Sequence, residues 1–351
     1  MKAAELAAHE RIADDWPVDG LESVLHCPYC KSPARTIAHE GVRDWSFYAA
    51  PGAWNYWQCS QCASLYLDPR PTSQTLSVAY GTYYTHNDQD RSSLSERLRR
   101  RVRNECWSVF HGIDLRPRLY VPRPFHWMLD PLRTRLSAPF HVEELSRLKP
   151  ARLVDVGCGN GYMLELATRL GWDATGLELD PAAVASACAL GLHVLEGGYE
   201  RLAEFERGVD CVLCSHVLEH VSDPRELIHL AARALKPGGV LLLALPNATS
   251  VLREIYGDNW RGLEAPRHLS IPSSQQLAAM LSEFGFTAAQ RLGRGVWTAT
   301  AAESSRIRRR GPTLNDADHA EANRIVVAPG DRTSARADLS EFVCVWEPSN
   351  G

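Results

Sequence analysis

The feature that most constrains the fold is a regular alternation of strand-like and helix-like segments over residues 152–246. Apolar runs such as RLVDVG (152–157) and VDCVLCSHV (209–217) alternate with amphipathic stretches such as YMLELATRLG (162–171). This alternation is typical of parallel strands covered by helices on both faces. Two further strands are expected at TAAQRLG (287–293) and EFVCVWEP (341–348). We therefore predict an α/β fold with a doubly wound, mostly parallel, seven-stranded sheet.

A glycine-rich turn follows the first of these strands, with Gly157, Gly159 and Gly161 at alternate positions. A strand, a glycine turn and a helix bring backbone N–H groups to a ligand at the carboxyl edge of a sheet. The spacing puts Tyr162 where a dinucleotide-binding turn needs glycine, and the Lys-Ser/Thr ending of a phosphate-binding loop is missing. The second strand ends in Glu178, a carboxylate that can accept hydrogen bonds from ribose hydroxyls. These residues favour a ligand with a ribose but disfavour NAD.

Residues 152–247 resemble class I S-adenosylmethionine-dependent methyltransferases through VDVGCGNG (154–161), GLELD (176–180), FERGVDCVLCSHVLEH (205–220) and LKPGGVLLLALPN (235–247). The resemblance implies that S-adenosylmethionine is the cofactor. It implies that the loop of Gly157, Gly159 and Gly161 carries the methionine moiety and that Glu178 binds the ribose. It further places Ser215 and His216 beneath the sulfonium. Asp155 is expected either to contact the cofactor or to orient the loop, and the residue that holds the adenine is left open.

Two Cys-x-x-Cys pairs lie near the start of the chain, CPYC at 27–30 and CSQC at 59–62. Four thiolates in this pattern predict a closed, tetrahedral structural zinc site, with Cys27, Cys30, Cys59 and Cys62 as ligands. A redox pair is the alternative, disfavoured because two pairs occur together. Cys211 and Cys214 share the spacing but lie within an apolar strand, where core packing explains them. With LDPRPTSQTLSVAYGTYY (67–84), the leader resembles that of bacterial methyltransferases from sugar, polysaccharide and secondary-metabolite pathways.

The chain divides, on these patterns, into a zinc-ribbon-like leader (1–91), connecting helices (92–148) and a methyltransferase domain (149–351) with a flexible loop at 301–337. Its 351 residues carry a net charge of −4, which exerts no global attraction on nucleic acid or acidic membranes. No apolar run is long enough to span a membrane, and the first residues are too polar for a signal peptide. We expect a cytoplasmic protein, and the oligomeric state is left open.

The acceptor site is expected where the insert 247–272 follows the fifth strand, with the tyrosines of AYGTYY (79–84) closing it. A histidine titrates near neutral pH and suits general-base catalysis, so His220 and His268 are the catalytic candidates. For His220, a structural role as the cap of the next helix explains the residue equally well. Glu219 is either a hydrogen-bond partner or a magnesium ligand. The substrate-binding candidates are Tyr84, Tyr256, Trp260 and Arg267.

The predicted function is O-methylation of a small-molecule or glycan acceptor. One alternative is an RNA methyltransferase that uses the zinc ribbon and the basic segments SERLRRRVR (95–103) and SSRIRRR (304–310). The acidic net charge and the lack of a clear basic and aromatic groove disfavour it. The other alternative is a non-catalytic interaction protein, which the intact glycines and Glu178 disfavour.

Overall fold

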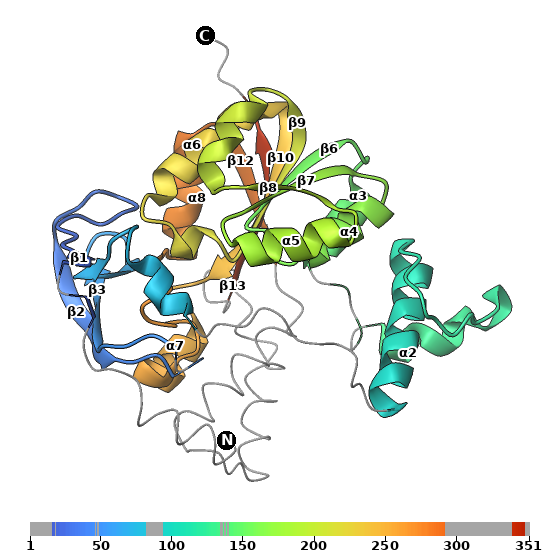
Figure 1. Cartoon of the computed structure of the whole chain (residues 1–351), viewed down its shortest axis with the longest axis horizontal. Helices are drawn as coiled ribbons and strands as arrows, with labels where there is room; N and C mark the ends of the chain where they lie inside the picture. Colours follow the sequence, from blue (N-terminus) through green and yellow to red (C-terminus); the bar gives the residue numbers. More distant parts are fainter. Residues whose placement is uncertain are drawn as a thin grey trace. The chain divides into compact units, whose positions relative to one another are not determined.

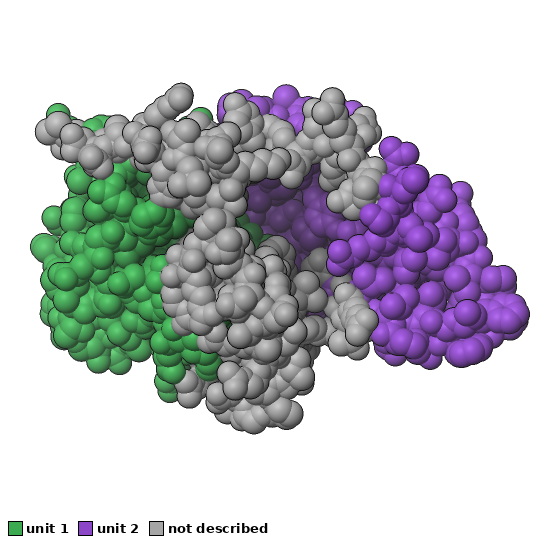
Figure 2. Space-filling model, turned by 90° about the horizontal axis from the view of Figure 1, so that it is seen from below, with its two compact units in different colours: residues 1–83, 215–232, 243–351 green, residues 84–214, 233–242 purple. Residues whose placement is uncertain are grey.

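A computed structural model describes residues 16–81 apart from 18, 46 and 48, and then residues 94–133, 136, 138, 140–291 and 339–347. Tyr84, the predicted loop 301–337 and the basic segment 304–310 lie outside these residues. The chain forms two compact units (Figure 2). Unit 1 comprises residues 1–83, 215–232 and 243–351, and unit 2 comprises residues 84–214 and 233–242.

Seven strands form one sheet in the order β12-β13-β10-β9-β6-β7-β8 (Figure 1). Strand β6 pairs in parallel with β7 and β9, and β7 pairs in parallel with β8, whereas β13 is antiparallel to β12. The predicted seven-stranded, mostly parallel sheet is confirmed. The strands are β6 (Arg152–Val156), β7 (Asp173–Glu178), β8 (His193–Glu196), β9 (Val209–Ser215), β10 (Leu235–Pro246), β12 (Phe286–Arg291) and β13 (Leu339–Trp346).

Helices alternate with these strands, and α5 and α8 begin at side-chain caps. Asp180 caps α5 by accepting a hydrogen bond from the backbone N–H of Ala182, and Pro181 occupies the first helical position. Helix α6 ends at Ala234, shortly before Lys236, which precedes a proline and is disfavoured in helical conformation. The helices are α4 (Tyr162–Arg169), α5 (Pro181–Ala189), η4 (Tyr199–Phe205), η5 (Leu218–His220), α6 (Pro224–Ala234) and α8 (Ser274–Glu283).

Helices also occupy the described part of the segment before the sheet. It contains α2 (Leu94–His111), η3 (Arg123–Leu132) and α3 (Phe140–Arg147). The second half of α2 is anchored in a small core, where Cys106 and Trp107 pack with residues of η3, α3 and α4. The indole of Trp107 also donates to the carbonyl of Leu136 at 3.0 Å. The first half of α2 lies outside this core.

The leader forms two small antiparallel sheets, and one of them includes a strand from the insert. Strand β1 (Leu21–Glu22) pairs with β5 (Arg70–Pro71). The second sheet has the order β11-β4-β3-β2. Its members are β2 (Arg35–Val42), β3 (Trp54–Cys59), β4 (Leu65–Leu67) and, about 200 residues later, β11 (Ser270–Ile271).

Leader and insert also share one hydrophobic core. The leader contributes Tyr56 and Leu65, and the insert contributes Trp260 and Leu269. The remaining elements are η1 (Leu76–Tyr80) in the leader, and α7 (Val251–Tyr256) and η6 (Gly257–Asn259) in the insert. The leader thus completes its hydrophobic core with residues of the insert.

Candidate functional site

The glycine turn has the backbone geometry that its sequence predicts. Gly157, Gly159 and Gly161 all have positive φ, at +68°, +54° and +83°. A Cβ on Gly161 would lie 2.4 Å from Leu192 Cδ1, so this position also needs glycine for packing. A Cβ on Gly159 would meet no atom within 4 Å, so only its φ demands glycine there. The turn therefore leaves open space beside its central residue.

Glu178 is held in place by the turn itself. The backbone N–H of Gly159 donates to Glu178 Oε2 at 2.8 Å, and that of Asp180 donates to Oε1 at 2.9 Å. A carboxylate oxygen can accept about two hydrogen bonds, so each oxygen keeps capacity for a further donor. The carboxylate is thus fixed in orientation and still able to accept hydrogen bonds from a ribose.

Asp155, the fourth residue of β6, is buried with an unsatisfied oxygen. Its side chain is 3% exposed, and Oδ2 has no hydrogen-bond partner among the residues that the structure describes. Burial, together with the charge of Glu178, raises the pKa of Asp155 to about 8. A buried unpaired oxygen is costly, which favours a ligand that brings a donor or a positive charge. S-adenosylmethionine has both a ribose and a cationic methionine end, and these residues fit it.

Ser215 and His216 lie at the end of β9. Val156 is paired with Cys214, so β6 and β9 end at the same edge of the sheet. His216 has a φ of +55°, donates its backbone N–H to the carbonyl of Ala244 at 2.7 Å, and places Nδ1 3.1 Å from Glu219 Oε1. A left-handed histidine is an uncommon conformation that no sequence signal predicts.

Two predicted catalytic residues, His220 and His268, meet in unit 1, with their rings 4.7 Å apart and edge to face. His220 Nδ1 lies 3.0 Å from both the carbonyl of Arg267 and the hydroxyl of Tyr80. His268 Nδ1 lies 2.7 Å from the carbonyl of Gly262. Because a carbonyl only accepts, these contacts favour the Nδ1–H tautomer in both rings, which leaves the lone pair on Nε2.

The two histidines differ in exposure. His268 is 5% exposed, whereas His220 is only partly buried. Burial lowers the pKa of His220 below its ordinary value of 6.5 and lowers that of His268 much further. Both rings are therefore neutral at neutral pH, and His220 is the more exposed of the two.

Arg267, whose carbonyl lies 3.0 Å from His220 Nδ1, has a completely buried side chain. Its guanidinium donates to both oxygens of Asp44, at 2.5 and 2.9 Å, to Glu264 Oε1 at 3.1 Å and to the carbonyl of Ala79 at 2.9 Å. Burial acts to raise the pKa of Asp44, but the bonds from Arg267 and from backbone amides outweigh it and lower that pKa. Sequence reasoning missed Asp44 because this residue belongs to no motif.

The buried ion pair of Asp44 and Arg267 connects the leader to the insert, and further hydrogen bonds join the same two segments. The hydroxyl of Tyr56 donates to the carbonyls of Leu263 and His268, the latter at 2.7 Å, and Tyr29 bonds Ser270 Oγ at 3.0 Å. Leader residues thus fix the backbone that carries His268.

The two other candidates from the insert, Tyr256 and Trp260, are 3% and 0% exposed, so a substrate contact by either stays a prediction.

The four cysteines of the leader converge as predicted. Their Sγ atoms lie within 4.8 Å of one another, with Cys27 and Cys62 3.6 Å apart and Cys30 and Cys59 3.5 Å apart. Each is a free thiol. A tetrahedral zinc with bonds of about 2.3 Å separates its sulfurs by about 3.8 Å, which this cluster matches closely.

The two turns that present the cysteines have the same backbone pattern. The N–H of the fourth residue after each leading cysteine bonds back to its carbonyl at 3.0 Å, at Lys31 and at Ala63. Both of these residues are left-handed, with φ of +64° and +59°. The two cysteine turns thus repeat an uncommon backbone conformation at two non-glycine residues.

A second group of possible metal donors coincides with the catalytic candidates. Glu219, His220 and His268 bring one donor atom each within 4.8 Å. Glu219 is completely buried, and its Oε2 has no partner among the described residues. The nitrogen and oxygen donors suit a divalent cation such as Mg²⁺, Mn²⁺ or Zn²⁺.

Comparison with known proteins supports the methyltransferase assignment. Residues 129–291 match the family described as "Methyltransferase domain". Among curated proteins, the ubiquinone biosynthesis O-methyltransferase of Xanthomonas axonopodis pv. citri is 42% identical over 138 residues, covering 35% of this chain and 56% of that protein. The enzyme of the same name from Xanthomonas euvesicatoria is 39% identical, covering 36% and 54%. The chain thus spans about half the length of the curated relatives it matches.

Solved structures show a more distant similarity. An S-adenosylmethionine-dependent methyltransferase from Archaeoglobus fulgidus has 19% identity and a TM-score of 0.40, covering 56% of this chain and 85% of that one. One from Mesorhizobium loti has 17% identity and a TM-score of 0.40, covering 58% and 97%.

The order of the seven strands, the glycine turn with its anchored carboxylate and the family match make residues 129–291 similar to class I S-adenosylmethionine-dependent methyltransferase domains.

Proposed function

We propose that the protein is an S-adenosylmethionine-dependent O-methyltransferase for a small-molecule acceptor, with His220 as general base. The observation that carries the proposal is the arrangement of His220, whose Nδ1 is engaged by the carbonyl of Arg267 while its ring stays partly exposed. Its Nε2 then has a free lone pair on a neutral ring. The curated relatives, named as O-methyltransferases of ubiquinone biosynthesis, also favour oxygen in a small molecule.

The chemistry follows from what each group supplies. The cofactor, when bound, brings a methyl group on a positively charged sulfur. The protein must align the acceptor oxygen with that methyl and exclude water. A hydroxyl nucleophile must also lose its proton, which His220 Nε2 accepts, and the hydroxyl of Tyr80, at Nδ1, helps to fix the ring.

Cofactor binding is proposed to rest on the glycine turn, on Glu178 for the ribose and on Asp155 for the cationic methionine end, with Ser215 and His216 beside the sulfonium. The unsatisfied Oδ2 of Asp155 supports direct contact over the alternative that this residue only orients the loop. Arg267 is proposed to shape the acceptor site rather than to bind substrate, because its side chain is 0% exposed.

The leader is proposed to hold one structural zinc through Cys27, Cys30, Cys59 and Cys62. Sulfur separations close to those of a tetrahedral site support this assignment. All four positions are taken by protein sulfur, so the ion has no open site for chemistry. Its role is to fix the strands that share a core with the insert.

A metal-assisted mechanism is a second candidate, favoured by the buried, unsatisfied oxygen of Glu219 beside His220 and His268. In that case a divalent cation would lower the pKa of the acceptor hydroxyl, and the histidines would be ligands. Activity that is lost on treatment with EDTA and restored by Mg²⁺ would favour this candidate over the general base.

The test of the proposed function is formation of S-adenosylhomocysteine when the full chain is mixed with S-adenosylmethionine and a panel of catechols and free sugars. Replacement of the base, as His220→Ala, should lower turnover by roughly 10²–10⁴-fold with cofactor affinity little changed. His268→Ala and the double variant separate the two histidines. Near-normal turnover in all three variants would refute the base. Methylation of ribosomal RNA transcripts in place of small molecules would favour the RNA alternative.

A further inference from the structure

We propose that α2 and η3 form a docking surface for anionic phospholipid membranes. The surface is defined by the first half of α2, residues 94–103, and by η3, residues 123–132, both in unit 2. The inference is independent of the proposed methyltransferase chemistry. No helix among the described parts of the chain is long and apolar enough to cross a bilayer, so the contact would be peripheral.

An apolar stripe runs along α2 and is buried at one end only. Leu94, Leu98 and Val102 are four residues apart and therefore share one face of the helix. The stripe continues into the small core at Cys106, which is 1% exposed, but Leu94 is 84% and Leu98 is 56% exposed. The start of the helix thus presents aliphatic side chains to solvent.

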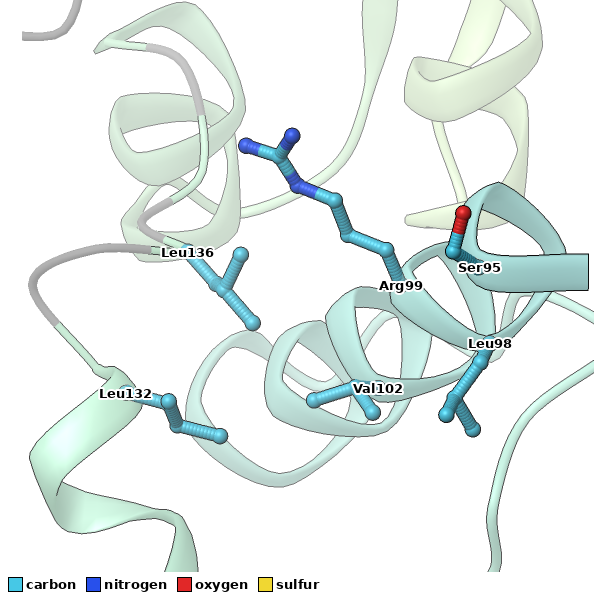
Figure 3. Close-up of a pocket in the computed structure, with 6 residues that line it drawn as sticks. All are labelled: Ser95, Leu98, Arg99, Val102, Leu132 and Leu136. Atoms are coloured by element: carbon cyan, nitrogen blue, oxygen red, sulfur yellow. The ribbon is translucent and has the colours of Figure 1, made fainter. Parts of the chain in front are cut away.

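A groove with a cavity of about 410 Å³ opens along this stripe, lined by Ser95, Leu98, Arg99, Val102, Leu132 and Leu136. Figure 3 shows Leu132 and Leu136 facing Val102 across the groove, with the guanidinium of Arg99 extending from α2. The adjoining helix η3 exposes three more large apolar side chains, Phe125 at 51%, Trp127 at 67% and Met128 at 57%. Contiguous exposed apolar surface of this kind marks an interaction site.

Positive charge surrounds the stripe. Arg97 and Arg101 flank it along one side of the helix, and Arg99 and Arg103 along the other. Residues 94–133 contain nine arginines and four acids, a net charge of +5 in a chain whose total is −4. Arginine beside leucine, methionine and tryptophan is the composition of helices that lie in the interface of an anionic bilayer. The apolar side chains that line the groove are all aliphatic, which fits acyl chains better than nucleic-acid bases and favours a lipid partner over RNA.

The test is co-sedimentation of the full chain with vesicles of neutral phosphatidylcholine, with and without phosphatidylglycerol at about one third of the lipid. Binding should require the anionic lipid and weaken with salt. Each arginine near an anionic surface contributes roughly fivefold. The triple variant Arg97→Ala, Arg99→Ala, Arg101→Ala should therefore bind about a hundredfold more weakly.

Two further variants make the result decisive. Leu98→Asp with Trp127→Ala removes the apolar contact and should also abolish binding to vesicles. The control removes three exposed cations elsewhere in unit 2, as Lys149→Ala, Arg152→Ala and Arg207→Ala, and should bind as the wild type does. All variants should keep the wild-type affinity for S-adenosylmethionine. Equal loss in the control, equal binding to neutral vesicles, or binding to RNA but to no vesicle would overturn the proposal.

Discussion

The glycine turn and the histidine cluster, which comprises His220, His268 and the residues around them, differ in how far apart in the sequence their contacting residues lie. In the turn, Glu178 accepts from Gly159, 19 residues away. In the histidine cluster, Tyr80 contacts His220, which lies 140 residues away in the sequence, and Asp44 pairs with Arg267, which lies 223 residues away. A site built from one strand–turn–helix unit can form wherever that unit folds. The proposed acceptor site forms only when the leader, the insert and the loop after β9 are folded together.

This difference should separate cofactor binding from catalysis. Damage to the leader should abolish turnover and leave cofactor affinity unchanged, whereas damage to the turn should weaken the cofactor and leave the leader intact. Substitutions in either region can test this separation.

Loss of a zinc ligand should be the most damaging change. Structural zinc contributes on the order of 10 kcal/mol in small domains, and the leader has no complete core without the insert. Cys59→Ser should therefore release zinc, melt the leader and insert, and abolish turnover while calorimetry finds S-adenosylmethionine bound as before. Cys188→Ser, at an exposed free thiol, is the matched control. Elemental analysis that finds no zinc in protein purified without chelator would contradict the site.

Breaking the buried ion pair should come next. Arg267→Met leaves the buried Asp44 without this cation and Glu264 with Arg261 as its remaining arginine partner, which should cost about 3–5 kcal/mol in the free energy of unfolding of unit 1. Arg201→Ala removes an exposed pair with Glu204 and should change little. Urea unfolding followed by tryptophan fluorescence measures both. A loss in Arg267→Met no larger than in the control would show that the pair does not hold the insert.

Turnover should depend on pH through His220. Burial lowers its pKa, so the neutral, active form persists below pH 6.5 and is lost only as the pH falls further. The acid limb of kcat/KM should therefore have its midpoint below pH 6.5 and fall about tenfold per pH unit beyond it. His220→Ala should remove this limb. A midpoint above about pH 7 would mean that another group titrates.

Cofactor affinity should depend on pH through Asp155 instead. With a pKa of about 8, the carboxyl is mostly protonated at neutral pH. The cationic methionine end favours the ionised form, so affinity should rise by up to about tenfold per pH unit toward pH 8, with release of a proton. Asp155→Asn should flatten this dependence in the same titration. A profile unchanged by the substitution would remove Asp155 from the cofactor site.

The sequence predicts the local features of the molecule and only part of the distant ones. The sheet and the glycine turn follow from apolar periodicity and from three positive-φ glycines, which are properties of short segments. The convergence of the four leader cysteines follows from the spacing of the two Cys-x-x-Cys pairs. Strand β11 could not be foreseen, because two residues carry no periodic signal and pair only when β4 is present. Asp44 and Tyr56 act through contacts with the insert that exist only after folding.

Calorimetric titration of S-adenosylmethionine into the wild type, Glu178→Ala and Asp44→Asn tests whether a local cofactor site is separate from an assembled acceptor site. We predict that Glu178→Ala weakens binding by roughly 1.5–3 kcal/mol, the usual worth of hydrogen bonds to a charged group. Asp44→Asn should bind the cofactor as the wild type does, while its turnover falls with that of the leader variants. Unchanged affinity in Glu178→Ala, or lost affinity in Asp44→Asn, would contradict the division between the two sites.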